Sequence, residues 1–202
     1  MSIGTFPFFS EQMKDIILFR RKLPVIDKEL IIKPLHLPRD INTIHQWVNQ
    51  PYAKTFWQMD GPVEMLYHHY EKVLSSGNGY SLMCFLDNVP VAQVEFYKVS
   101  SDEVKVHFDY TETDFGIHLL MGSYNLPLAD LSRNVMITAI AFLFTLDIGR
   151  VIGEPDALNE KANKLVEDVG FRFIKKIKMS YKTANLYIYE KADFLNKYKG
   201  LF

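Results

Sequence analysis

The stretch from 114 to 122, DFGIHLLMG, places a histidine inside a run that otherwise has the pattern of a buried strand. An imidazole titrates near neutral pH, so His118 can take a proton from an attacking group; the plainer alternative is a structural histidine whose ring is hydrogen-bonded in the core. A second ionisable group, Asp156, follows in EPDALN. This pair indicates proton-transfer chemistry if the fold brings the two side chains together.

The elements around the two residues predict how they meet. The segment 115–122 reads as a strand that is apolar on both faces, 132–146 as a helix, and 150–155 as a short strand that ends at a proline. Such a crossover makes its two strands parallel, and ligands collect at the carboxyl ends of parallel strands. We therefore expect His118 and Asp156 at one edge of the sheet.

The rest of the chain predicts an α+β fold of mixed topology. We expect a single domain over 28–202, with 1–27 as an extension packed on it and containing an extra strand at 17–23. Two helices, the first capped by Asp40, precede an antiparallel meander, with 51–61 as the loop between them. After the crossover come a helix capped by Asn159 and two final strands. The expected strands are 29–35, 80–86, 91–99, 103–110, 115–122, 150–155, 171–180 and 184–191, and the expected helices are 38–50, 62–75, 132–146 and 159–169.

Composition narrows the function classes. The 202 residues are 48% hydrophobic, and 23 basic side chains nearly balance 24 acidic ones, so we expect a small-molecule partner, with no nucleic acid and no membrane. The lone cysteine, Cys84, reads as a core residue. Adjacent His68 and His69 point about 100° apart on a helix, and no further ligand spacing completes a set, so no metal is expected. Without a leader or an apolar span we expect a cytoplasmic protein.

Three stretches carry a resemblance to a known family. GIHLLMG, then VIGEPDALNEKANKLVEDVGFRFIKKI, and upstream HQWVNQPYAKTFWQMDG resemble the GNAT acetyltransferases, over about 28–190. More narrowly they resemble the siderophore branch, which acylates the side-chain amine or hydroxylamine of lysine-like substrates: aerobactin-type hydroxylysine acetyltransferases and the mycobactin lysine acyltransferase. HLL, EPD and FW together are more specific than the N-x-x-A and Gly-Phe pattern alone. The resemblance implies a GNAT fold, whose mixed, mostly antiparallel sheet splays between its fourth and fifth strands and is flanked by helices.

The resemblance also implies roles for individual residues. His118 and Asp156 match the catalytic positions: His118 would take the proton of the attacking nitrogen, while Asp156 would either orient His118 or hold the acceptor. Trp57 and Phe56 would wall the acceptor pocket. Acetyl-CoA or another short acyl-CoA is the implied co-substrate, and the residues implied to hold it are Leu119, Leu120, Met121, Ser132, Arg133 and Asn159.

Two positions depart from the wider family pattern. The family's pyrophosphate loop is glycine-rich, whereas the matching stretch SYNLPLADLSRN has no glycine. The family's tyrosine that protonates the leaving thiolate is replaced by Val166. Both departures leave open a catalytically weak GNAT-like domain that binds a small ligand or a partner.

The function that the sequence predicts is therefore transfer of an acetyl or succinyl group to a lysine- or diamine-like amine or hydroxylamine in hydroxamate siderophore biosynthesis. An acyltransferase for peptide or antibiotic amines would share the mechanism and differ only in the acceptor. A monomer and a homodimer are both compatible with the sequence.

Overall fold

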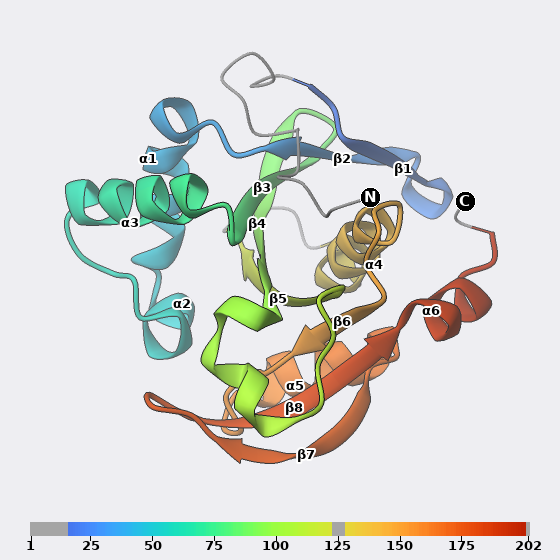
Figure 1. Ribbon diagram of the computed structural model, residues 1–202. Coiled ribbons are helices and arrows are strands. Elements are labelled where there is room, and N and C mark those ends of the chain that lie inside the picture. The colour runs from blue at the N-terminus through green and yellow to red at the C-terminus, as the bar shows by residue number, and fades with distance from the viewer. Residues whose placement is uncertain (1–15, 123–127, 201–202) are drawn as a thin grey trace. The chain divides into compact units, whose positions relative to one another are not determined.

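The structure, a computed structural model, describes residues 16–122 and 128–200 (Figure 1). Its strands are β1 (Phe19–Leu23), β2 (Lys28–Pro34), β3 (Gly79–Leu86), β4 (Val89–Lys98), β5 (Asp114–Met121), β6 (Arg150–Gly153), β7 (Arg172–Lys178) and β8 (Thr183–Glu190). Its helices are α1 (Leu37–Val48), α2 (Pro51–Trp57), α3 (Val63–Ser76), α4 (Leu131–Leu143), α5 (Glu160–Val169) and α6 (Lys191–Lys197), with 3-10 helices η3 (Pro24–Ile26), η4 (Val99–Ser101) and η5 (Glu103–His107).

The strands form a mixed sheet in the order β1-β2-β3-β4-β5-β6-β8-β7. β5 and β6 pair in parallel, whereas β1 with β2, β2 with β3, β6 with β8 and β7 with β8 pair antiparallel. The α+β class and the parallel crossover predicted from the sequence are thus confirmed. The extra N-terminal strand is also present, as β1.

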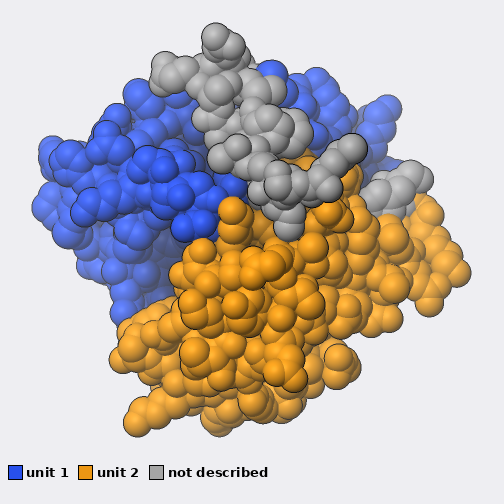
Figure 2. Space-filling model, viewed as in Figure 1, with its two compact units in different colours: residues 1–95, 119–129 blue, residues 96–118, 130–202 orange. Residues whose placement is uncertain are grey.

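The chain divides into two compact units (Figure 2). Unit 1 comprises 1–95 and 119–129, and unit 2 comprises 96–118 and 130–202. The boundary falls within β4 and β5, each of which contributes residues to both units. The division of the chain into an extension ending at residue 27 and one domain stays a prediction.

Unit 1 buries the apolar stripe of α1 against α3 and β3. Ile44 and Val48, one helical turn apart, are fully buried, as the spacing predicts. The sequence predicts Asp40 as the cap of this helix, but the N-cap residue is His36; Asp40 lies inside the first turn of α1, where its carboxylate accepts the backbone N–H of His36 at 2.9 Å. Cys84 is buried in β3, and burial raises the pKa of its thiol to about 12, which makes it a core residue.

Unit 2 buries the β6–β8–β7 strands together with residues from η4 and η5. α4 packs on α5, and every residue of α4 from Val135 onward is buried, which explains why its sequence is apolar on every side. In α5, Asn159 caps the helix by accepting the N–H of Ala162 at 3.1 Å, and the chain turns at Gly170 with φ of 123°.

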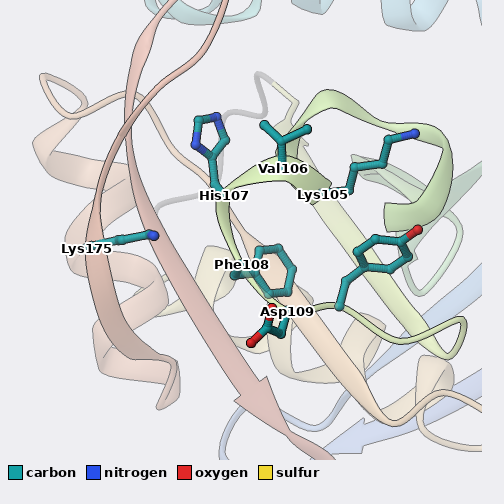
Figure 3. Close-up of a pocket in the computed structure, with 7 residues that line it drawn as sticks. Lys105, Val106, His107, Phe108, Asp109 and Lys175 are labelled. Carbon is teal, nitrogen blue, oxygen red and sulfur yellow. The ribbon is translucent and has the colours of Figure 1, made fainter.

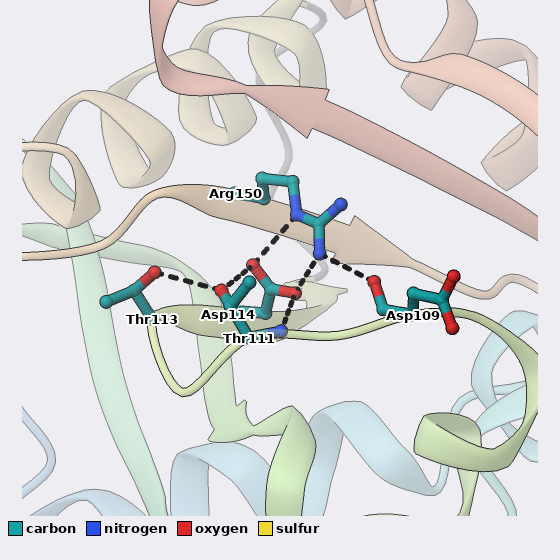
Figure 4. Close-up of polar contacts among 5 residues, drawn as sticks. All are labelled: Asp109, Thr111, Thr113, Asp114 and Arg150. Carbon is teal, nitrogen blue, oxygen red and sulfur yellow. Dashed lines mark hydrogen bonds and ion pairs between the residues drawn. The ribbon is translucent and has the colours of Figure 1, made fainter.

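An ion pair fastens the first residue of β5 to the first residue of β6 (Figure 4). Arg150 donates from Nε to Asp114 Oδ1 at 2.9 Å and from Nη2 to the carbonyl of Asp109 at 2.9 Å. Asp114 also accepts the backbone N–H and the hydroxyl of Thr111. The Asp114 carboxylate is completely buried, so this network holds the parallel pair in register.

Three segments differ from the sequence prediction. The expected loop 51–61 begins with helix α2, because Pro51 occupies the first turn, where a missing N–H costs nothing. The expected strand 103–110 is instead η5 followed by a loop. Asp102 caps it at Val104 N, and Val104 is buried while Val106 is exposed, which a strand with period-two alternation would not give. The residues that follow β8, for which no helix was predicted, form α6.

Candidate active site

His118 occupies the part of β5 that runs on beyond its pairing with β6. The parallel register ends at Gly116 opposite Ile152, two residues before His118. β5 is buried up to Ile117, and the His118 side chain is then 34% exposed. The imidazole therefore has both a buried and an accessible side.

The buried side of His118 contacts Glu154, which follows β6 directly. His118 Nε2 lies 2.6 Å from Glu154 Oε1, and the glutamate side chain is only 1% exposed. Burial alone would raise the pKa of Glu154, but the charge and hydrogen bond of His118 and the charge of Lys182 outweigh it and lower the pKa below its usual value. In the tautomer in which Nε2 donates to an ionised Glu154, the lone pair of the neutral imidazole is on Nδ1.

Two further side chains of unit 2 complete this cluster. Lys182 Nζ donates to the backbone carbonyl of Glu154 at 2.6 Å and lies 3.7 Å from Oε1. The Tyr97 ring packs on the His118 ring with centroids 5.1 Å apart. Burial, followed by the Glu154 charge, raises the pKa of Tyr97 well above its usual value, so its hydroxyl stays protonated.

Asp156 lies elsewhere in the loop after β6. Its Oδ1 accepts the backbone N–H of Leu158 at 2.8 Å, and its backbone forms an isolated bridge with Ala184. The carboxylate hydrogen-bonded to His118 is Glu154, so the expectation that Asp156 orients the imidazole gives way to one in which Glu154 does. A role of Asp156 in holding the acceptor stays a prediction.

The parallel register explains why Glu154 was missed. Continuing it two residues past the Gly116–Ile152 pair brings His118 level with Glu154. The sequence predicted a carboxylate at the end of this strand. It does not contain the register between β5 and β6, which determines whether Glu154 or Asp156 lies beside His118. Lys182 and Tyr97 carried no recognisable local signal, because they reach the site from the β7–β8 turn and from β4.

The residues predicted to hold acyl-CoA lie on β5, on α4 and at the N-cap of α5. Leu120 is a core residue of unit 1, while Leu119 and Met121 are half-buried, and the Met121 carbonyl accepts the Tyr52 hydroxyl at 2.9 Å. Asn159 uses its side chain as the cap of α5. Their contacts with a cofactor stay predictions.

Ser132 and Arg133 lie in the first turn of α4. The first amides of a helix have no intrahelical acceptor, and the helix dipole favours an anion there. Arg133 Nε is buried and has no hydrogen-bond partner among the described residues. A diphosphate fits such a group of donors. Residues 123–127 of the glycine-free stretch lie outside the described part of the chain.

The predicted acceptor-pocket residues lie on α2. Phe56 is 40% exposed, and Trp57 packs on the core of unit 1 within hydrogen-bonding reach of the Tyr70 hydroxyl. That hydroxyl donates to Glu95 at 2.6 Å and lies 3.1 Å from Gln93 Oε1. Unit 1 thus gathers an indole and a carboxylate around one phenol, of which the sequence indicated only the indole.

A cavity of about 600 Å³ opens in unit 2 beside η5 (Figure 3). It is lined by Lys105, Val106, His107, Phe108, Asp109, Tyr110 and Lys175. None of the residues predicted from the sequence lines this cavity, and neither His118 nor Glu154 does.

Comparison with known families identifies the chain. Residues 36–179 match the model of the acetyltransferase (GNAT) domain. The chain is 24% identical over 182 residues to N(6)-hydroxylysine O-acetyltransferase of Escherichia coli, covering 89% of this chain and 58% of that protein. It is 22% identical to N-hydroxyputrescine acetyltransferase of Acinetobacter baumannii, covering 77% and 75%. The chain therefore spans less than two thirds of the length of the first of these relatives.

Solved structures share the fold. A Bacillus halodurans protein of 22% identity superposes with a TM-score of 0.84, covering 90% of this chain and 94% of that one. The aminoglycoside acetyltransferase AAC(6')-Ib, solved with coenzyme A, has a TM-score of 0.76 at 14% identity, covering 85% and 99%. Within 16–122 and 128–200, no helix has the length and apolar character to cross a membrane. The match over most of the chain means that this protein belongs to the acetyltransferase (GNAT) family.

Proposed function

We propose that this protein transfers an acetyl or succinyl group from acyl-CoA to the side-chain amine or hydroxylamine of a lysine- or diamine-like acceptor, as a step toward a hydroxamate siderophore. The observation that carries the proposal is the hydrogen bond of 2.6 Å between His118 Nε2 and the buried carboxylate of Glu154. It leaves an accessible imidazole oriented as a general base by an ionised partner.

The base acts on the nitrogen of the acceptor. A nitrogen that attacks a thioester must lose a proton, and His118 Nδ1 accepts it while Glu154 stabilises the resulting imidazolium. The thioester supplies an activated carbonyl carbon. The backbone N–H groups of β5 beyond Gly116 extend past the pairing with β6, and we propose one of them as the donor to the developing oxyanion.

We propose that the N-termini of α4 and α5 bind acyl-CoA. The α4 amides with Arg133 would provide donors for the diphosphate, and Asn159 at the start of α5 would contact the pantetheine arm. Val166 is 5% exposed in the core, so α5 offers no hydroxyl at this position to the leaving thiolate. The thiolate is released as the anion or takes its proton from solvent.

The acceptor class rests on the relatives and on unit 1. Two of the relatives are named for N(6)-hydroxylysine and N-hydroxyputrescine, both of which carry a second cationic amine. Trp57 and Glu95 together provide an aromatic face and a carboxylate, the two groups that bind ammonium most readily.

The first test is release of free thiol by the purified protein. Acetyl-CoA or succinyl-CoA is combined with lysine, cadaverine, putrescine and their N-hydroxylated forms, with kanamycin as the antibiotic acceptor. We expect thiol release that depends on one hydroxylated acceptor. Release with kanamycin alone would overturn the siderophore assignment, and silence with every pair, with no coenzyme A binding by calorimetry, would favour a ligand-binding domain.

A further inference from the structure

Glu154 is shared by a histidine and a lysine of unit 2. Its Oε1 lies 2.6 Å from His118 Nε2 and 3.7 Å from Lys182 Nζ. The glutamate is 1% exposed and the lysine 15%, so solvent screens neither charge strongly. Lys182 also donates to the Glu154 carbonyl at 2.6 Å.

The β7–β8 turn holds Lys182 in this position. The Met179 N–H donates to the Lys182 carbonyl at 2.9 Å and closes the turn. The Lys182 ammonium also lies 5.3 Å from the centroid of the Tyr181 ring. The ammonium is therefore placed at the carboxylate by backbone and side chain together.

A cation near Glu154 changes how strongly the carboxylate stabilises the imidazolium form of His118. A buried carboxylate whose only partner is a histidine favours the imidazolium, which cannot accept a proton. A permanent cation on the same carboxylate balances its charge and repels the imidazolium. The carboxylate can then orient the ring without forcing it to stay protonated.

We propose that Lys182 is a positioning residue that neutralises Glu154, so that His118 is held in place by the carboxylate and still stays in its proton-accepting form. This deepens the proposed function, on which it rests, because it assumes that His118 is the base. It predicts opposite effects on His118 for loss of the two charged groups: removing Lys182 favours the imidazolium, and removing Glu154 disfavours it.

Other ionisable groups face the same cluster. Tyr97 and Tyr181 have pKa values raised by burial, the latter to about 12, so both are neutral phenols at assay pH. Asp102 feels the charges of both Glu154 and His118, and burial raises its pKa, so its titration could also move that of His118. Glu103 stays ionised, because the Ser180 N–H bound to its carboxylate lowers its pKa.

The first experiment titrates His118 directly by NMR, in the absence of substrates. The His118 signal is assigned by its loss in His118→Ala. We expect the His118 pKa to rise by roughly one unit in Lys182→Met and to fall by a similar amount in Glu154→Gln. Lys182→Arg keeps the charge and should leave the pKa near that of the wild type. The matched control is Lys178→Met, an exposed lysine of the same hairpin.

The second experiment measures kcat/KM against pH. The acid limb should move to higher pH in Lys182→Met, with the alkaline plateau retained, and to lower pH in Glu154→Gln. A uniform loss at every pH, or an unmoved His118 titration in Lys182→Met, would overturn the proposal. Asp102→Asn serves as a further control, since a larger shift there than in Lys182→Met would also contradict it.

The two experiments separate this proposal from the proposed function. If no acceptor is acylated but the His118 titration responds with the expected signs, the charge balance stands and the acyltransfer assignment fails. If thiol is released but the titration does not respond, the proposed function stands and the role of Lys182 is refuted.

Discussion

At the scale of single residues, the site depends on which carboxylate meets His118. Glu154 is buried, ionised and bonded to the imidazole, whereas Asp156 binds the backbone of its own loop. A buried carboxylate that stays ionised needs hydrogen-bond donors and a nearby cation, and His118 Nε2 and Lys182 supply them. Glu154 and Asp156, two positions apart in EPD, thus have different surroundings and different expected roles.

Replacing His118 by alanine tests the base. We expect kcat to fall about a hundredfold or more, because His118 is the group proposed to accept the proton of the attacking nitrogen. Coenzyme A binding by calorimetry should persist, since the predicted contacts with acyl-CoA come from other residues. Unchanged turnover would remove His118 from the mechanism.

Replacing Asp156 by asparagine tests the remaining role of that residue. The amide oxygen can still accept the Leu158 N–H, so the melting temperature should stay near that of the wild type. If the charge holds the acceptor, the KM for the acceptor should rise or kcat should fall. A steady-state profile that does not change would assign Asp156 to the loop alone.

At the scale of elements, β4 and β5 approach so closely that Gly116 leaves no room for a Cβ unless the Tyr97 side chain moves. A Cβ at Gly116 would fall well inside the van der Waals distance of the Tyr97 ring. The same ring packs on His118. Because Gly116 has no side chain, the Tyr97 ring fits against β5 there and packs on His118, which lies two residues further along the strand.

Gly116→Ala should displace Tyr97 and disturb His118 with it. We expect a loss of about 1–3 kcal/mol in the free energy of unfolding, measured with urea, together with a lower kcat. Gly153→Ala on β6 is the matched control, because its Cβ would meet Phe171 at an ordinary 3.6 Å. Equal stability of the two variants would contradict this account of Gly116.

At the scale of the whole molecule, stability depends on the buried ion pair that starts the parallel strands. The Asp114 carboxylate is completely buried and accepts hydrogen bonds from Arg150 and from Thr111 (Figure 4). Removing one partner of such a pair leaves an uncompensated charge in the interior, which costs more than the pair itself contributes.

Arg150→Met should therefore lower the free energy of unfolding by about 3–5 kcal/mol, a loss that heat or urea denaturation would detect. Arg172→Met, at an exposed position of β7, is the control and should change stability little. A small effect of Arg150→Met would mean that Asp114 is solvated or protonated once its partner is gone.

The sequence by itself determined most elements, because hydrophobic period, caps and turn residues are local properties. It indicated β5 with its histidine, the crossover to β6, the Asn159 cap and the family. It missed α2 and η5. Pro51 is compatible with a loop and with the first turn of a helix, and the segment with Val104 and Val106 is compatible with a strand and with a 3-10 helix. Only packing decides between these alternatives. The tertiary structure alone decided that Glu154, Lys182 and Tyr97 surround His118. Strand register and the approach of the β7–β8 turn are long-range properties, and no local pattern encodes them.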